Sequence, residues 1–414
     1  RITIDPSSNL TVGETYHISY PSGAFTNTGG DVDYVGTAYT FGVRSYTGKL
    51  FSWGYNSNGV LGHNNSMPGR KGYSSPTQIP GTTWMSIGGG IGGGGSALIA
   101  TKSDGTLWMW GDNGSGQLGQ NSPGGRSSPI QIPGTTWSEN HIATEGQTSG
   151  AVKTDGTLWV WGNNSFGRLG QNQNPSTLNG TSSPIQIPGT SWSTTAGTLS
   201  SGNSIFAIKT DGTAWGWGRA SYGSLGLNDD DVDYSSPVQL PGTTWKQFSA
   251  SNYNSAAVKT DGTLWAWGFG TTGRLGLNQE TATRSSPTQI PGTTWKQIAN
   301  GYEYMLAVKT DGTLWAWGKN TQGNLGLNNR TQYSSPTQIP GTTWAYVGAN
   351  INNATVASKT DGTLWSWGSE SYGQLGQNNL TKYSSPTQIP GTDWSTEISK
   401  LGVGMRHFAI IQAT

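Results

Sequence analysis

The sequence lacks cysteine altogether and carries few charged residues. The absence of cysteine among its 414 residues excludes disulfides, thiol nucleophiles and cysteine metal sites, and leaves the redox compartment open. Charged residues make up 11% and the formal net charge is +1, so no strong field would attract nucleic acid or an anionic membrane. No apolar run approaches the roughly 18 residues that a membrane-spanning helix needs.

The chain is also poor in groups suited to catalysis. Its histidines, each in a different local sequence, are His17, His63, His141 and His407. No serine–histidine–aspartate set and no metal-ligand spacing accompanies them. A glycine-rich run at residues 88–95 lacks the Lys-Ser/Thr that completes a phosphate-binding loop. We therefore expect no enzymatic activity and no cofactor.

One acidic run offers oxygen ligands of the kind that bind calcium. Its candidate ligands are Asp229, Asp231 and Asp233, within Asp-Asp-Asp-Val-Asp. The run has neither the spacing nor the glycine of an EF-hand loop. The pattern favours a solvated acidic loop, and we predict no metal site.

Glycine and tryptophan are abundant, with 64 and 20 residues, and both follow an internal repeat. Residues 259–268 read Lys-Thr-Asp-Gly-Thr-Leu-Trp-Ala-Trp-Gly, and residues 309–318 are identical. Close copies occupy 102–111, 153–162, 209–218 and 359–368, and a degenerate first copy occupies 47–54. Self-similarity at a period of about 50 residues indicates a solenoid, a propeller or an array.

Each repeat predicts four antiparallel strands. Asp-Gly between two short runs rich in β-branched and aromatic residues indicates a hairpin, and we expect a two-residue type I′ turn there. Another strand follows each Pro-Gly-Thr-Thr-Trp, as at 296–299, and another follows Ser-Ser-Pro, as at 287–290. No repeat reads as a helix. The repeats therefore predict an all-β fold, a seven-bladed β-propeller of four-stranded blades.

The tryptophans fit this architecture. Thirteen lie in the third strand of a unit, twelve of them after Asp-Gly and Trp53 in the degenerate first copy, and seven follow Pro-Gly. A tryptophan that recurs at one place in every unit is best explained by packing between neighbouring blades, where its large apolar area is buried.

The two ends of the chain are predicted to close the ring. Residues 394–412 supply the first two strands of a blade, and residues around 50–53 and 76–79 supply its other two, which would remove exposed strand edges. The propeller would span 47–414. Residues 1–46 read as a short N-terminal β segment with a hairpin and a strand over 37–43, either the tail of a preceding domain or a docking arm. Because the chain begins at Arg1 rather than Met, we expect a processed product or a fragment.

The repeat motif points to a family. Gly-x-Asn-x-x-Gly-x-Leu-Gly, as at 318–326, preceded by an Asp-Gly-x-hydrophobic-x-x-Trp-Gly strand, resembles the repeat of the regulator of chromosome condensation family. Residues 404–410, Gly-Met-Arg-His-Phe-Ala-Ile, are similar to that family's Gly-x-x-His-x-x-Ala strand. The resemblance covers 47–414 and implies a seven-bladed propeller. It implies no single activity, since members include nucleotide exchange factors, chromatin binders, light sensors and secreted enzyme inhibitors.

The sequence departs from the best-known members of that family. It has no basic tail, no predominantly basic surface and no Gly-Trp-Arg-His-Thr units of the light-sensing branch, and the nucleotide-handling residues of an exchange factor match no position. Its uniform repeats are similar to those of structural proteins of marine bacterial viruses that carry such repeats. Its N-terminal stretch, with Ile-Asp-Pro-Ser-Ser-Asn-Leu-Thr at 4–11 and Tyr-His-Ile-Ser-Tyr-Pro-Ser-Gly-Ala-Phe-Thr-Asn at 16–27, resembles the same proteins.

Variation among the repeats suggests where a partner binds. The Asp-Gly turns and the Pro-Gly-Thr-Thr-Trp connections hardly vary and should share one face of the propeller. The turns between first and second strands and the loops between third and fourth strands vary, and should share the opposite face. Binding residues collect on loops held by a rigid scaffold. The candidate contact residues are Asn252, Tyr253, Tyr302, Glu303, Tyr304, Asn352, Phe166, Tyr222 and Tyr372.

From these observations we predict that the protein is a non-enzymatic structural and recognition module, virion-associated or extracellular. It would bind a receptor, a glycan or a neighbouring subunit through the variable face. The alternative is an intracellular protein-binding regulator that acts on a GTPase or another protein. A third class, a glycan-active enzyme, would require an essential carboxylate, and we expect no turnover.

Overall fold

The structure is a computed structural model that describes residues 15–18, 39–42, 48–66, 72–88, 97–122, 124–145 and 147–413. The chain divides into two compact units, Arg1–Thr47 and Gly48–Thr414. In the first unit, β1 (Thr15–Ile18) pairs antiparallel with β2 (Tyr39–Gly42), which falls within the strand expected over 37–43. The loop of the hairpin expected within the first twenty residues lies outside the described residues.

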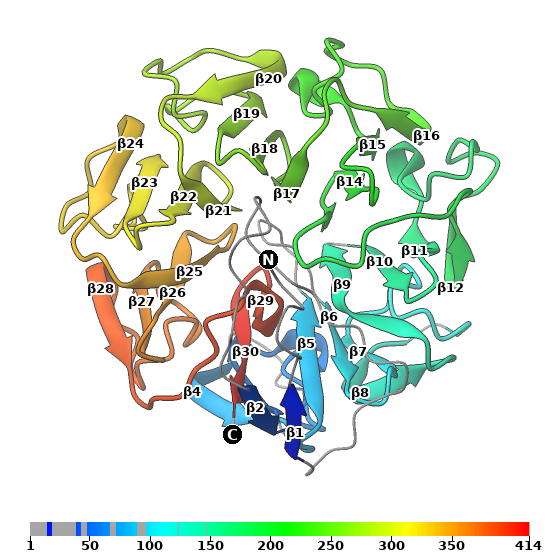
Figure 1. The fold of residues 1–414 in the computed structure, drawn as a ribbon, viewed down its shortest axis with the longest axis horizontal. Helices are drawn as coiled ribbons and strands as arrows, with labels where there is room; N and C mark the ends of the chain where they lie inside the picture. The colour runs from blue at the N-terminus through cyan, green and yellow to red at the C-terminus, as the bar shows by residue number, and fades with distance from the viewer. Residues whose placement is uncertain are drawn as a thin grey trace, which may run out of the picture. The chain divides into compact units, whose positions relative to one another are not determined.

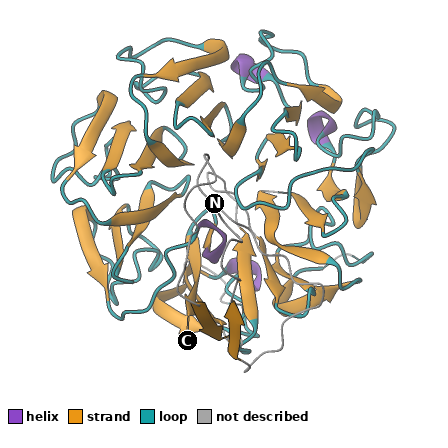
Figure 2. Ribbon diagram, viewed as in Figure 1, coloured by secondary structure: helices purple, strands orange, loops and turns teal. Residues whose placement is uncertain are grey.

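The second unit is a ring of seven four-stranded antiparallel sheets (Figure 1). Strands dominate the ring, and the helical segments are short 3-10 turns (Figure 2). These turns are η1 (Ser57–Gly59), η2 (Ser165–Gly167), η3 (Ser221–Gly223) and η4 (Ile398–Lys400). The predicted seven-bladed propeller is confirmed.

We number the blades from the one that joins the two ends of this unit, and list each from its inner to its outer strand. Blade 1 contains β29 (Leu401–Val403), β30 (His407–Ala413), β3 (Gly48–Tyr55) and β4 (Gly72–Gln78). Blade 2 contains β5 (Trp84–Gly88), β6 (Ala97–Lys102), β7 (Leu107–Gly111) and β8 (Arg126–Ile132). Blade 3 contains β9 (Trp137–Glu145), β10 (Thr148–Lys153), β11 (Leu158–Asn163) and β12 (Gly180–Gln186).

Blade 4 contains β13 (Leu199–Ser201), β14 (Ser204–Ile208), β15 (Ala214–Gly218) and β16 (Tyr234–Gln239). Blade 5 contains β17 (Trp245–Ala250), β18 (Asn254–Lys259), β19 (Leu264–Gly268) and β20 (Arg284–Ile290). Blade 6 contains β21 (Trp295–Asn300), β22 (Tyr304–Lys309), β23 (Leu314–Gly318) and β24 (Tyr333–Ile339). Blade 7 contains β25 (Trp344–Ala349), β26 (Ala354–Lys359), β27 (Leu364–Gly368) and β28 (Tyr383–Ile389).

Blade 1 closes the ring as the sequence predicts. Strand β30 from the C-terminal end pairs antiparallel with β3 along its whole length, from Gly48↔Ala413 to Gly54↔His407. Because β3 and β30 hydrogen-bond to each other, neither strand leaves this edge unpaired and able to pair with another chain.

The Asp-Gly hairpins form, but with a different turn from the one expected. The nitrogen of Gly262 donates to the oxygen of Lys259 at 3.0 Å, and Gly262 alone takes a left-handed φ of 80° in this turn. Thr260 and Asp261 are therefore the central residues of a type I turn, followed by a left-handed glycine. The expected type I′ turn was wrong, because the carboxylate of Asp261 binds the nitrogen and hydroxyl of Thr263, at 2.9 and 2.7 Å, which a two-residue loop would not allow.

Tryptophans join successive blades. In each third strand, the tryptophan directly before glycine is fully buried. Its Nε1 donates to a backbone oxygen of the preceding blade at 2.8 to 3.0 Å. These seven tryptophans are Trp53, Trp110, Trp161, Trp217, Trp267, Trp317 and Trp367. The glycine of Leu-Gly makes room for them, since a Cβ on Gly276 would lie 2.7 Å from Nε1 of Trp317. The expected packing role is confirmed.

The loops separate onto two faces of the ring. On the constant face, each Asp-Gly turn meets the connection to the next blade, as where the nitrogen of Trp295 donates to the oxygen of Gly262 at 2.9 Å. There Lys259 lies between the rings of Trp245 and Trp265, with Nζ at 4.5 and 4.6 Å from their centroids, and blades 2 to 7 all repeat this arrangement. Packing and cation–π contact thus explain why these loops hardly vary.

Candidate functional site

The variable face is built from three chain positions that meet where blades 1, 3, 4, 5, 6 and 7 each join the preceding blade. One is the residue before Gly-x-Leu-Gly in one blade. The other two lie in the next blade: the residue after Trp-Gly, and the last residue of the turn between first and second strands. The backbone holds the latter pair together, as where the nitrogen of Phe269 donates to the oxygen of Tyr253 at 2.8 Å. Each of these six junctions therefore presents three side chains from two blades.

Aromatic rings occupy the strained position at two adjacent junctions. Phe166 and Tyr222, each before Gly-x-Leu-Gly, have left-handed φ values of 63° and 60°. Asn58 takes the same conformation in blade 1, and asparagine is the residue that tolerates it best after glycine. Aromatic residues at this costly conformation need a compensating contact or a function.

The contacts form an aromatic–arginine cluster, which we define as Phe166, Arg219, Tyr222, Tyr253 and Phe269. The ring of Tyr222 lies 4.5 Å from that of Phe269 and 5.5 Å from that of Tyr253, between centroids. The guanidinium carbon of Arg219 lies 4.8 Å from the centroid of Phe166 and 5.2 Å from that of Tyr253. Tyr222 remains 45% exposed. The cluster is thus a continuous surface across blades 3, 4 and 5.

Arg219 is half-buried on the variable face. Its Nε donates to Oγ of Ser221 at 2.9 Å, and it makes no salt bridge within the described ranges. Arg274, one blade further, contrasts with it: this arginine is buried and pairs with Glu303 at 3.0 Å, and Lys319 binds the same carboxylate. Cation–π contact with the rings of Phe166 and Tyr253 restrains the guanidinium of Arg219.

A second, smaller group lies where blade 7 meets blade 1. The rings of Tyr55 and Tyr372 lie 4.9 Å apart between centroids at an interplanar angle of 57°, and the guanidinium carbon of Arg406 lies 5.6 and 4.8 Å from their centroids. Nε of Arg406 is buried without a hydrogen-bond partner in the described part of the chain. The same three positions therefore give an aromatic–arginine group at two separate places on the variable face.

Comparison with known proteins identifies the repeat. Residues 21–352 match the RCC1-like domain, and residues 361–411 match the regulator of chromosome condensation (RCC1) repeat. The chain belongs to the regulator of chromosome condensation family. The resemblance stated from the sequence is confirmed for the family and for the propeller fold.

Similar proteins share part of this RCC1-like chain. The E3 ubiquitin-protein ligase HERC2 of mouse and human is 28% identical over 211 residues, which are 48% of this chain and 4% of that protein. The mitochondrial RCC1 domain-containing protein RUG3 of Arabidopsis thaliana is 29% identical over 192 residues, 44% of this chain and 40% of that protein. The matched region therefore spans less than half the length of these relatives.

Solved structures agree with the fold. Prp20p of Saccharomyces cerevisiae superposes with a TM-score of 0.74 at 20% identity, over 88% of this chain and 91% of that one. Human WBSCR16 superposes with a TM-score of 0.72 at 18% identity, over 88% and 98%. At this identity the likeness establishes the RCC1-type propeller and nothing finer.

One of the predicted contact residues is misplaced. The structure buries Tyr304 completely, and its hydroxyl donates to the backbone oxygens of Asn350 and Ala354 in blade 7, at 3.1 and 2.8 Å. The same hydroxyl accepts from Oγ1 of Thr355 at 3.4 Å, and burial raises the pKa of Tyr304 above its usual range. Its ring lies over Gly301, where a Cβ would come within 2.0 Å of Cε1. Tyr304 is therefore a link between blades and offers no surface to a partner.

The other predicted residues lie on the variable face of this RCC1-like propeller, where their binding role stays a prediction. Phe166, Tyr222 and Tyr253 come together in the cluster, and Tyr372 joins the second group. Asn252, Tyr302, Glu303 and Asn352 are half-buried. Two of these are already engaged, since Glu303 binds Arg274 and Nδ2 of Asn352 donates to the oxygen of Met405 at 3.2 Å.

Sequence reasoning missed Arg219, Phe269, Arg406 and Tyr55. Three of them share a signal: Tyr55, Arg219 and Phe269 each directly follow Trp-Gly, a position that differs in every blade within an otherwise uniform stretch. Comparison of the repeats at this position would have found them.

The remaining polar candidates show no catalytic arrangement among the described residues. Nε2 of His63 lies 3.0 Å from Oγ of Ser52, but that serine is buried and donates to the oxygen of Leu61. Burial lowers the pKa of His407 to about 3, so this histidine is neutral inside blade 1. The side chains of His17 and His141 lie outside the described residues.

The acidic loop engages its own neighbours. Asp229 accepts from the hydroxyl of Tyr234 at 2.8 Å, and Asp233 accepts from the nitrogen of Ala220 at 3.0 Å. Within the ranges that the structure describes, no group of three or more histidines, aspartates or glutamates is placed to hold a metal ion. Asp231, the remaining candidate ligand, therefore belongs to no such group there. In the same ranges, no helix is long and apolar enough to cross a membrane.

Proposed function

We propose that this chain is a non-catalytic, protein-binding propeller whose partner docks on the variable face at the aromatic–arginine cluster. The observation that carries the proposal is the exposed Tyr222 in a cluster with Arg219, whose guanidinium lies over the rings of Phe166 and Tyr253. Tyrosine and arginine dominate the binding energy of protein interfaces, because each combines apolar area with hydrogen-bonding groups.

The relatives favour an intracellular regulator over a virion-associated or extracellular module. Prp20p is described together with its binding to Gsp1p and histones, and in a further solved structure yeast RCC1 is bound to Kap60. RUG3 is named as a mitochondrial protein. A protein partner inside a cell is the interpretation that these relatives support for this chain. They give no support to a glycan ligand or to a particle subunit as partner.

Neither ligase nor exchange activity is part of the proposal. HERC2 is named as a ligase, but the match covers 4% of that protein. The nucleotide-handling residues of an exchange factor have no counterparts here, so a GTPase could be the bound partner without being a substrate. Proteins that share a fold can differ in function, because function depends on the residues at the site and these differ from one chain to another.

Site-directed photo-crosslinking tests the proposal. A benzoylphenylalanine at position 222 on the variable face should capture a discrete partner from the source cells, and the exposed Thr293 on the constant face is the matched control position. With the captured protein purified, Tyr222→Ala and Arg219→Ala should each weaken binding about 10-fold or more, the range of an interface hot spot. Equal capture at both positions, or unchanged affinity in both variants, would refute the proposal.

A further inference from the structure

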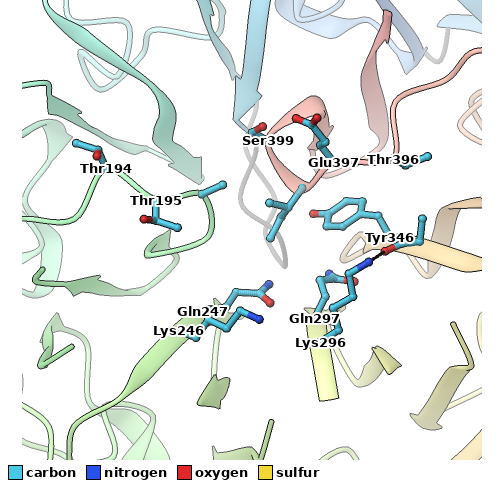
Figure 3. A pocket seen from close by; sticks show the side chains of 13 residues that line it. Thr194, Thr195, Lys246, Gln247, Lys296, Gln297, Tyr346, Thr396, Glu397 and Ser399 are labelled. Atoms are coloured by element: carbon cyan, nitrogen blue, oxygen red, sulfur yellow. Dashed lines mark hydrogen bonds between the residues drawn. The ribbon is translucent and has the colours of Figure 1, made fainter. Parts of the chain in front are cut away.

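A cavity of about 620 Å³ lies at the axis of the ring, away from the cluster (Figure 3). Its walls come from the first residues of β17, β21 and β25, and from the segments that precede β13 and β29. Because these residues directly follow the constant-face connections, the cavity occupies the constant-face end of the axis. Its volume falls within the range of small-molecule sites, roughly 300 to 1,000 Å³.

Two glutamines make the wall rigid. Gln247 bonds both the nitrogen and the oxygen of Ile298 in the next blade, at 3.3 and 3.0 Å. Gln297 does the same with Val347 one blade further, at 3.1 and 2.9 Å. Each amide thus bonds the open backbone edge of the next inner strand through both its nitrogen and its oxygen. We therefore assign the ligand-binding groups to other residues of the cavity.

Three polar side chains remain available on this side of the cavity. Lys246 is exposed and makes no hydrogen bond or salt bridge in the described part of the chain, and Lys296 beside it donates to the oxygen of Ala345 at 3.2 Å. The hydroxyl of Tyr346 has no hydrogen-bond partner among the residues that the structure describes, although only 2% of the residue is exposed, and it points toward the cavity (Figure 3). A buried hydroxyl without a partner is unfavourable, and a ligand acceptor would recover that free energy.

The repeat shows that these groups are particular to one sector of the ring. The residue after the constant-face tryptophan is lysine only at 246 and 296, and is methionine, serine or alanine in the other five blades. The next position is tyrosine only at 346. Packing of the repeat therefore does not require them. Two cations and a donor hydroxyl converge on three adjacent inner strands.

We propose that this axial cavity binds a small molecule through an anionic group, a carboxylate or a phosphate, held by Lys246 and Lys296 with a hydrogen bond from Tyr346. Glu397 lies on the opposite wall, which disfavours a ligand that is anionic at both ends (Figure 3). Burial raises the pKa of Tyr346, so its hydroxyl keeps its proton and can donate throughout the neutral range. The site is independent of the partner-binding face and of the proposed function.

The test uses the full chain and the fluorescent probe toluidinylnaphthalene sulfonate, which joins an aromatic body to one anionic group. Lys246→Gln with Lys296→Gln should raise the dissociation constant of the probe at least 10-fold, whereas Arg330→Gln, at an exposed arginine that does not line the cavity, should leave it unchanged. Sodium phosphate and sodium acetate should displace the probe to different extents, which separates the two anion classes, with sodium chloride at equal ionic strength as the control. No probe binding, or equal binding by the double variant, overturns the proposal.

Tyr346→Phe distinguishes a ligand-binding hydroxyl from a structural one. It should weaken probe binding about 3-fold to 10-fold while the unfolding midpoint stays equal or rises, because the hydroxyl has no partner to lose within the described ranges. A lower midpoint with unchanged probe binding would assign the hydroxyl to the fold and contradict the proposal.

Discussion

Nε1 of Trp317 in blade 6 donates to the backbone oxygen of Arg274 in blade 5 at 3.0 Å, across a junction from which water is excluded. The same bond recurs at every junction, including the one closed by Trp53 and Gln374. Each bond joins residues more than forty positions apart, so the blades are coupled to one another as well as folded individually.

Replacing Trp317 should therefore lower the free energy of unfolding more than replacing Trp315 in the same strand. Trp317→Phe leaves the oxygen of Arg274 without the indole and opens a void, so we expect a loss of about 2–4 kcal/mol in the free energy of unfolding. Trp315→Phe is the matched control: this ring is half-buried and bonds only its own turn, through Oγ1 of Thr313, so we expect about 1 kcal/mol. Guanidinium unfolding monitored by circular dichroism measures both, and equal losses would contradict the junction role.

The two tyrosines of the turn at 301–304 should behave oppositely. Tyr304→Phe removes the bonds to Asn350 and Ala354 and should lower the free energy of unfolding by about 1–2 kcal/mol without changing partner binding. Tyr302→Ala, at a half-buried surface position, should change stability by less than about 0.5 kcal/mol and weaken the partner captured at position 222. Thermal unfolding and titration of that partner separate the two effects, and loss of binding in Tyr304→Phe would reverse the assignment.

The blades and the ring closure could be predicted because their signals are local and repeated. Asp-Gly, Trp-x-Trp and Pro-Gly-Thr-Thr-Trp each recur at a fixed place in the unit. The turn type could not be predicted from Asp-Gly alone, since glycine takes a left-handed φ in both candidate turns and the bonds of Thr263 to Asp261 decide between them.

The site could be predicted only in part. The pattern of variation identifies the face, but contacts between blades decide which side chains reach solvent. Tyr304 turns inward because Gly301 has no Cβ to exclude its ring, and a similar relation holds between Gly404 and His407. Arg219 was missed because its partners, Phe166 and Tyr253, come from the blades on either side.

Glu303 is expected to matter for stability rather than for binding. Glu303→Gln removes the carboxylate that pairs with buried Arg274 and with Lys319, so we expect the free energy of unfolding to fall by about 1–3 kcal/mol. Glu280→Gln, at an exposed carboxylate in blade 5, should change it by less than about 0.5 kcal/mol. Urea unfolding at low and high salt is the measurement, and a loss that disappears at high salt would mean that the pair is screened like a surface contact.

The Asp-Gly turns should make the propeller sensitive to acid. Hydrogen bonds from Thr263, through its hydroxyl and then its backbone nitrogen, lower the pKa of Asp261 from its ordinary value of 3.8, and the equivalent aspartates of blades 2, 3, 4, 6 and 7 are lowered in the same way. With a depressed pKa the folded state binds fewer protons than the unfolded state. The contribution is therefore complete above pH 3.8 and is lost as the pH falls below it.

Asp261→Asn together with Asp311→Asn should flatten this acid dependence, because an amide oxygen still accepts from the threonine but does not titrate. Asp230→Asn is the control, since that carboxylate accepts no hydrogen bond in the described part of the chain. Unfolding midpoints between pH 2 and 5 give the slopes. An unchanged slope in the double variant would show that other carboxylates govern acid unfolding, and that the turns hold their shape with aspartate protonated.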